Sequence, residues 1–182
     1  MDTSSQNARY EQWLRYLNID ATTISTLKEF GKLVSPQMGA IMDAFYTHIG
    51  SNAAASAVFP SPQSMSYARE MQLHHWQDYV FSGNFDGLQF RAQAIGSTHY
   101  RSGVDLLFYL GGYCIILDEL ARFVTETYAG RPEDQHRFLS ALTRAIFLDL
   151  GLSISVYYES KTDELEAATR DLALSLARAG AD

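Results

Sequence analysis

Residues 35–49 read SPQMGAIMDAFYTHI, and this stretch decides the fold class. Its apolar and aromatic side chains recur at i, i+3, i+4, i+7, i+8 and i+11 counted from Met38, which places them on one face of a helix. Ser35 can cap the start of that helix, and Pro36 suits its first turn. The stretch therefore predicts an amphipathic helix from Ser35 to Ile49 that ends at the glycine after it.

Helical spacing continues on both sides of this stretch. It predicts helices over residues 4–17, 21–33, 64–81, 86–101, 103–128 and 133–170. No segment alternates apolar and polar residues with a period of two, and no hairpin turn joins two apolar runs. We therefore expect an all-α fold whose last two long helices, joined by a short turn, pack antiparallel.

Composition narrows the classes of function. The chain has 182 residues, 47% hydrophobic and 13% aromatic, so it can bury a sizeable core as one domain. Its net charge of −7 argues against a nucleic-acid partner, because phosphates would be repelled. Cys114 is the only cysteine, which excludes an internal disulfide and a cysteine-rich zinc site.

The same composition gives no sign of a membrane protein. The longest apolar run, from Leu106 to Leu117, is shorter than the ~20 residues of a membrane span. The chain also opens without the basic and apolar segments of a signal peptide. We therefore expect a cytoplasmic protein with no membrane span.

The chain changes character from Lys161 onward. Leucines at positions 165, 172 and 176 keep a narrow apolar seam, while acidic and basic residues cover the other faces. We expect the main domain to occupy residues 1–160 and a helical linker to begin in residues 161–182. Two interpretations of this segment stay open: a helix that meets a coiled-coil partner, or a solvated terminus.

Five histidines are candidates for metal ligands. His74 and His75 are adjacent on a predicted helix, about 100° apart, and cannot both face one metal. No His-x-x-x-His spacing occurs, so the sequence does not support a zinc or di-iron site. We interpret these two, with His48 and His136, as surface histidines or as histidines with a hydrogen-bond partner.

His99 differs from the other four because it continues an apolar stripe formed by Leu88, Ala92 and Ile95. A buried imidazole without a partner costs about 1–3 kcal/mol, so the ring must find a hydrogen-bond partner or bind a ligand. The pattern alone favours a core histidine with a partner over an iron ligand. Tyr46 poses the same question, because it lies on the apolar face of its helix while carrying a hydroxyl.

An imidazole and a hydroxyl that point inward from separate helices suit a haem pocket. Histidine supplies the axial ligand that haem iron needs. A hydroxyl on the opposite face can donate a hydrogen bond worth about 1.5–3 kcal/mol to an oxygen ligand. The chain has no Gly-x-Ser-x-Gly elbow and no phosphate-binding glycine loop, so we expect a binding protein and not an enzyme.

Several motifs resemble those of globin-coupled sensors. Residues 95–104, IGSTHYRSGV, are similar to that family's proximal-histidine signature, Ile-x-x-x-His-x-Arg-Ile-Gly, with serine in place of the second isoleucine. Residues 75–86 resemble the turn before the proximal helix, and residues 45–49 resemble the distal motif. Residues 109–113, YLGGY, resemble the start of the next long helix. These matches follow one another in the family's order.

The resemblance implies a globin fold with an extra N-terminal helix and no well-formed D helix, binding haem b. His99 would be the axial iron ligand, Tyr46 the distal hydrogen-bond donor and Gln72 a second distal residue. The remaining residues implied for the site are Tyr109, next to the proximal histidine, and the haem-lining Phe45, Ile95, Val104 and Phe108.

The resemblance also implies a function, that of a haem-based gas sensor. Oxygen is the first candidate, and carbon monoxide and nitric oxide also bind ferrous haem. Such sensors form homodimers through their two long C-terminal helices and signal to an output domain, for example a diguanylate cyclase or a histidine kinase. No output domain follows in this chain, so we expect a part of a longer protein or a stand-alone sensor globin.

The alternative function is a haem-free globin-fold module that takes part in bacterial signalling. It would use the same helices, with His99 buried and bulky side chains filling the pocket. Ala92 and Gly96 are small and belong to the proposed proximal helix, which favours haem.

Overall fold

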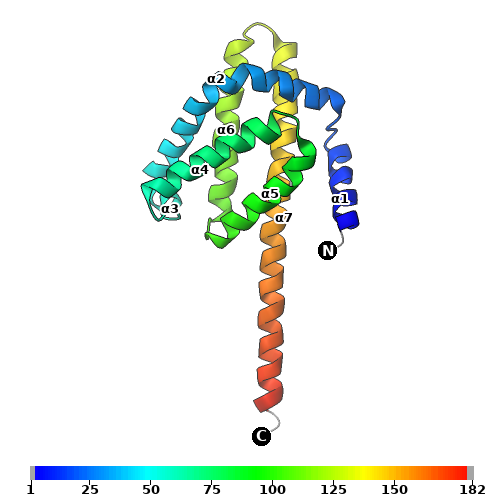
Figure 1. The fold of residues 1–182 in the computed structure, drawn as a ribbon, viewed down its shortest axis with the longest axis vertical. Coiled ribbons are helices and arrows are strands. Elements are labelled where there is room, and N and C mark those ends of the chain that lie inside the picture. The colour runs from blue at the N-terminus through cyan, green and yellow to red at the C-terminus, as the bar shows by residue number, and fades with distance from the viewer. Residues whose placement is uncertain (1–2, 180–182) are drawn as a thin grey trace.

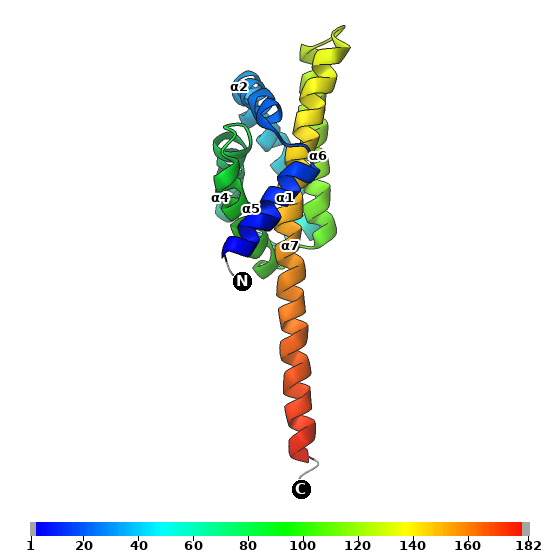
Figure 2. The ribbon, with the colours of Figure 1, turned by 90° about the vertical axis from the view of Figure 1, so that its right-hand side faces the viewer.

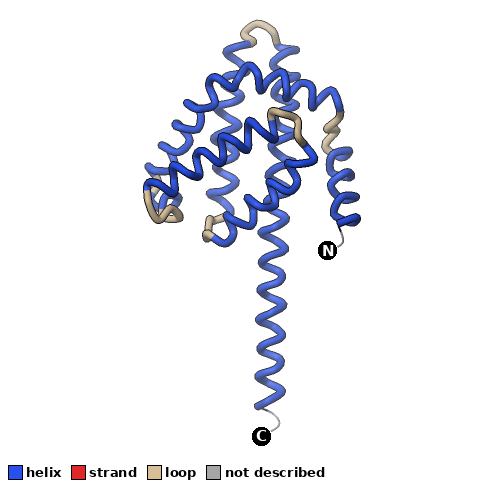
Figure 3. The backbone as a smooth tube through the Cα atoms, in the orientation of Figure 1, coloured by secondary structure: helices blue, strands red, loops and turns tan. Residues whose placement is uncertain are grey.

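The computed structural model describes residues 3–179, which are mostly helical, with no strand among them (Figure 1, Figure 3). The helices are α1 (Thr3–Tyr16), α2 (Ala21–Ser51), α3 (Ala53–Ser56), α4 (Pro62–His75), the π-helix η1 (Trp76–Val80), α5 (Phe85–Arg101), α6 (Leu106–Thr127) and α7 (Pro132–Ala179). The all-α prediction is therefore confirmed.

The long helices α6 and α7 run antiparallel, and α2, α4 and α5 cross them on one side (Figure 1, Figure 2). Helix α5 packs along α7, and α2 packs on α4, α6 and α7. Helix α1 is attached through Tyr10, whose hydroxyl donates a hydrogen bond of 2.5 Å to the Phe85 carbonyl at the start of α5. The C-terminal half of α7 projects away from the other helices.

Aromatic rings hold the end of the domain opposite to that projection. The Phe30 ring lies 5.6–5.8 Å from the rings of Phe81, Phe123 and Phe138, measured between centroids. These rings come from α2, the turn after η1, α6 and α7. Because Phe30 and Phe138 are fully buried, this cluster fixes the three long helices relative to one another.

The predicted helices 21–33 and 35–49 are one continuous helix, so the boundary between them is wrong. A Cβ atom on Gly31 would lie 2.5 Å from the Phe81 Cβ, so the glycine allows the turn after η1 to approach α2 and does not end a helix. The Ser35 hydroxyl donates to the Gly31 carbonyl at 2.6 Å instead of capping. The cap lies at Asp20, whose carboxylate accepts the Thr23 N–H at 2.8 Å.

Other predicted boundaries shift by a few residues. Helix α5 is capped by Asn84, which accepts the Gly87 N–H at 3.1 Å, and not by Asp86. Helix α6 begins only after its cap at Asp105, so Val104 lies in the preceding loop. The predicted helix 64–81 is formed by α4 and η1 together, and α7 extends beyond residue 170 to Ala179.

Helix α7 has two parts with different surroundings. Between Phe138 and Ser153 it contributes many of the core side chains, whereas residues 163–179 are exposed throughout. By length and composition alone, α7 is apolar enough over one window to cross a membrane, but 44% of that window is buried inside the domain. The packing of its N-terminal half in the core therefore accounts for the apolar sequence.

Candidate functional site

His99 lies near the C-terminal end of α5, and its ring is fixed by its own helix. The Nδ1 atom lies 2.9 Å from the Ile95 carbonyl oxygen, one turn earlier. A carbonyl can only accept, so Nδ1 carries the proton in the neutral ring and Nε2 keeps a free lone pair. Burial lowers the pKa of His99, and the hydrogen bond to Ile95 opposes this only in part, so the ring is neutral near pH 7.

The structure brings four of the predicted proximal residues together. The Tyr109 ring of α6 lies 4.7 Å from the His99 ring between centroids. The Val104 N–H in the α5–α6 loop donates to the His99 carbonyl at 3.0 Å, and Ile95 holds Nδ1 as described. The Tyr109 ring also stacks on Tyr157 of α7, with 5.8 Å between centroids. His99 therefore lies where α5, the following loop and α6 meet.

The small residues of α5 serve a different purpose from the one expected. A Cβ atom on Gly96 would lie 2.6 Å from the Ser153 carbonyl oxygen, and the Ser153 hydroxyl donates to the Ala92 carbonyl at 3.1 Å. Both small residues thus face α7 and allow the backbones of the two helices to approach closely. The interpretation that they provide space for haem is wrong, because the space is filled by α7.

Tyr46 and Phe45 define a second region, on α2. Phe45 is buried, and its ring lies within 3.3 Å of the position that a Cβ on Gly112 of α6 would take. The Tyr46 ring packs edge-on against Phe45 at 5.1 Å and against Phe59 at 6.3 Å. Burial raises the pKa of Tyr46 well above its usual range, so the hydroxyl keeps its proton. No described residue forms a hydrogen bond with that hydroxyl, which leaves it free to donate to a ligand.

Two predicted residues are less constrained by their neighbours. Gln72 is half-buried on α4, and its amide has no hydrogen-bond partner within residues 3–179. Phe108 lies in the first turn of α6 and remains 41% exposed, next to Leu107, which is 77% exposed. Exposed apolar side chains at this place are consistent with an apolar ligand beside the α5–α6 loop. The roles of Gln72 and Phe108 stay predictions.

Sequence patterns did not reveal a group of buried polar residues beside this region. His75, interpreted from the sequence as a histidine at the surface or with a partner, is only 3% exposed, and its Nε2 lies 2.8 Å from the carboxylate of Asp149, which also accepts the Tyr113 hydroxyl at 2.7 Å. A signal was present in the sequence, because Asp149 is the only charged residue between Ala145 and Tyr158. An isolated acid in an apolar helix requires a partner.

The available donors fit a haem group better than a bare metal ion. No three His, Cys, Asp or Glu residues of the described chain come together as a metal cluster. A single neutral imidazole with a free Nε2 is, however, the usual protein ligand of haem iron, since the porphyrin supplies the other four nitrogens. The hydrogen bond on Nδ1 is the second contact that such ligands normally make.

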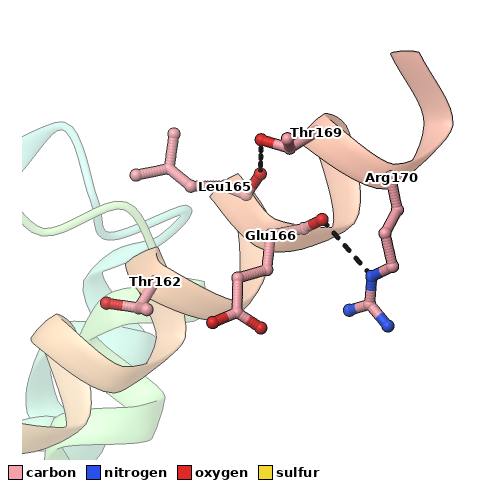
Figure 4. A pocket seen from close by; sticks show the side chains of 5 residues that line it. All are labelled: Thr162, Leu165, Glu166, Thr169 and Arg170. Atoms are coloured by element: carbon pink, nitrogen blue, oxygen red, sulfur yellow. Dashed lines mark hydrogen bonds between the residues drawn. The ribbon is translucent and has the colours of Figure 1, made fainter. Parts of the chain in front are cut away.

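A shallow hollow on α7 does not compete with this site. Its lining residues, Thr162, Leu165, Glu166, Thr169 and Arg170, come from one helix (Figure 4). Their hydrogen bonds stay within that helix: the Thr169 hydroxyl donates to the Leu165 carbonyl, and Arg170 Nε donates to the Glu166 carbonyl. An open surface of this kind encloses no ligand.

Comparisons with known proteins agree with this fold. The family model described as Protoglobin matches residues 6–163. The structure resembles the globin domain of the Geobacter sulfurreducens globin-coupled sensor, with a TM-score of 0.75 and 12% identity over 81% of this chain and 96% of that one. It also resembles the globin domain of Escherichia coli DosC in its ferric form, with a TM-score of 0.61 and 11% identity over 81% of this chain and 99% of that one. A comparison with curated protein sequences gives no match.

Proposed function

The chain belongs to the protoglobin family, and on that premise we propose that it is a haem-based gas sensor domain with His99 as the iron ligand. The observation that carries this proposal is the state of the His99 ring. Its proton is held on Nδ1 by the Ile95 carbonyl, its burial keeps it neutral, and its Nε2 has no partner among the described residues. An imidazole prepared in this way is suited to bind a metal.

The proposed cofactor is haem b, which in its ferrous state would bind O2, CO or NO. Tyr46 is the proposed donor of a hydrogen bond to that gas, because its hydroxyl is protonated and unpaired. Oxygen is the ligand we propose, since a partly negative diatomic gains most from such a donor. Phe45, Ile95, Val104 and Phe108 would line the group, with Tyr109 beside the proximal ligand and Gln72 near the gas.

The proposed signal leaves the site through α7. Helix α5, which carries His99, packs against α7 at the Gly96–Ser153 crossing without intervening side chains. A shift of α5 would therefore displace α7. The C-terminal part of α7, beyond residue 160, extends away from the domain. We propose that α6 and α7 also form a homodimer interface and that residues 161–182 begin a linker to an output domain of a cytoplasmic sensor. Any catalytic activity would belong to that output domain.

The experiment that tests the proposal is a visible spectrum of the protein purified with haem available. A Soret band that shifts on reduction and on addition of O2 or CO supports it. A protein that remains colourless after incubation with haem supports the haem-free signalling module instead. Light scattering at micromolar concentration tests the dimer separately, since a monomeric mass contradicts the interface without affecting the haem site.

A further inference from the structure

Four polar side chains from the helices α4, α6 and α7 form a largely buried, hydrogen-bonded group next to the site. The Asp149 carboxylate of α7, 1% exposed, accepts the Tyr113 hydroxyl of α6 at 2.7 Å and lies 2.8 Å from His75 Nε2 at the end of α4. The Tyr113 hydroxyl lies 3.3 Å from the Tyr109 hydroxyl, one helical turn away on α6. One buried carboxylate thus connects α4, α6 and α7.

The last residue of this group, Tyr109, lies beside the proposed iron ligand, His99. The Tyr109 ring lies 4.7 Å from the His99 ring and also stacks on Tyr157 at 5.8 Å, measured between centroids. Its hydroxyl is fixed by Tyr113. The plane and the tip of the Tyr109 ring are therefore both determined, and the ring limits the directions in which His99 can tilt.

Stability alone does not explain the group. Burying a carboxylate is unfavourable, and apolar side chains of equal size usually pack at least as well. In this cluster Asp149 Oδ1 and His75 Nδ1 are buried without any partner among the described residues. A core arranged only for stability would leave neither atom unpaired. The arrangement suits a role in positioning, since two hydrogen bonds to the same Asp149 oxygen restrict the geometry of both partners.

We propose that Asp149 is a positioning residue for His99, acting through the hydroxyls of Tyr113 and Tyr109. Asp149 holds Tyr113, Tyr113 holds Tyr109, and the Tyr109 ring sets the orientation of the His99 imidazole. Because Asp149 belongs to α7, the orientation of the proximal ligand is tied directly to the helix that leaves the domain. This inference rests on the proposed function in that it takes His99 as the iron ligand.

The test uses Tyr113→Phe, which removes one oxygen atom and leaves the His75–Asp149 contact in place. In the ferrous, haem-loaded protein, resonance Raman spectroscopy reports the iron–histidine stretching band. We expect this band to broaden and move to lower frequency, since an imidazole that is free to tilt bonds the iron less directly. Loss of haem to an acceptor protein should accelerate by up to about 10-fold, the lower end of what outer-shell changes produce at metal sites.

Two comparisons make the result specific. Asp149→Asn should shift the band in the same direction, and the double variant should shift it no further than the larger single change, because both act along one path. Tyr10→Phe is the matched control: it deletes a buried hydroxyl that donates to the Phe85 carbonyl and forms no hydrogen bond with this cluster. An unchanged band in Tyr113→Phe, or an equal shift in Tyr10→Phe, overturns the inference.

A measurement without haem separates this inference from the proposed function. In the apoprotein, the ring current of Tyr109 shifts the carbon-bound proton resonances of His99, which NMR detects. Tyr113→Phe should move these resonances, and Tyr10→Phe should not. If the His99 resonances move but the protein never binds haem, the proposed function is overturned and the positioning of His99 by Asp149 is supported. If the His99 resonances stay fixed in Tyr113→Phe and the protein does bind haem, the positioning role is overturned and His99 remains the iron ligand.

Discussion

Two histidines on neighbouring helices, His75 and His99, are both largely removed from water but have different partners. His75 is the more deeply buried, and its Nε2 is taken up by the Asp149 carboxylate. His99 uses Nδ1 on the Ile95 carbonyl of its own helix, and its Nε2 has no partner among residues 3–179. Each ring therefore has one nitrogen without a described partner, but Nδ1 of His75 is fully buried, whereas His99 is only partly buried and its Nε2 is accessible to a ligand.

The contrast shows that burial alone does not identify a binding histidine. A carboxylate partner fixes one nitrogen of the ring and holds two helices together, as His75 does between α4 and α7. A carbonyl partner one turn earlier fixes the tautomer without adding charge, and it leaves the opposite nitrogen free. The His75–Asp149 contact therefore also holds helices together, whereas the hydrogen bond of His99 leaves one of its nitrogens available to a ligand.

Replacing the binding histidine gives the largest expected effect. In His99→Ala, haem affinity should fall by more than about 100-fold, beyond the 10- to 100-fold loss typical of outer-shell changes. The apoprotein should stay folded, because no other described side chain depends on the His99 ring for a hydrogen bond. Haem titration followed at the Soret band measures the first expectation, and circular dichroism measures the second. His48→Ala, an exposed change, is the control, and equal affinities in the two variants would contradict the assignment.

Replacing His75, the histidine paired with Asp149, should instead lower the stability of the fold. His75→Ala leaves the buried Asp149 carboxylate with Tyr113 as its one partner, and breaking a buried pair in this way costs about 3–5 kcal/mol of unfolding free energy. Urea denaturation of the apoproteins measures it against wild type and His99→Ala. A loss under about 1 kcal/mol, well short of that range, would mean that the two histidine regions are not distinct in the way proposed.

The fold class and the region of His99 were accessible from the sequence, for a physical reason. Helical periodicity depends on neighbours three and four residues apart, which one sequence displays directly. The position of His99 after Leu88, Ala92 and Ile95 indicated a buried face of the same kind. Residue spacing alone favoured a core histidine with a hydrogen-bond partner over a ligand, and the structure shows that this partner, the Ile95 carbonyl, occupies Nδ1 and leaves Nε2 free.

The features that the sequence could not predict depend on contacts between distant segments. Gly31 resembled a helix end because only the three-dimensional structure shows Phe81 pressed against it. Gly96 was interpreted as leaving space for a ligand, because the residue that packs against it, Ser153, is distant in the sequence. His75 and Asp149 are 74 residues apart, so neither position indicated its partner. Such contacts follow from helix packing, which local patterns do not determine.

A change on α2 tests the hydroxyl of Tyr46, which forms no hydrogen bond with any described residue. Tyr46→Phe removes that hydroxyl and keeps the ring that packs on Phe45 and Phe59. A donated hydrogen bond worth about 1.5–3 kcal/mol would be lost, so oxygen should dissociate roughly 10- to 100-fold faster. Stopped-flow displacement of O2 by CO measures the rate, with Tyr67→Phe, an exposed tyrosine, as control. An unchanged rate would remove Tyr46 from the gas-binding role while leaving His99 as the ligand.

The smallest effect concerns the pH dependence of the apoprotein. Burial lowers the pKa of His99 below its value in the unfolded chain, about 6.5. Above that pH both states hold a neutral ring, so His99 does not affect the slope. As the pH falls below about 6.5, the unfolded state binds a proton that the folded state resists, and folding stability declines until the folded pKa is reached. As the pH falls below about 6.5, the urea midpoint of wild type should therefore fall more steeply than that of His99→Phe, which has no titrating ring. Parallel curves would show that the ring is as accessible to protons in the folded state as in the unfolded chain, which is incompatible with a site that keeps this imidazole neutral for iron.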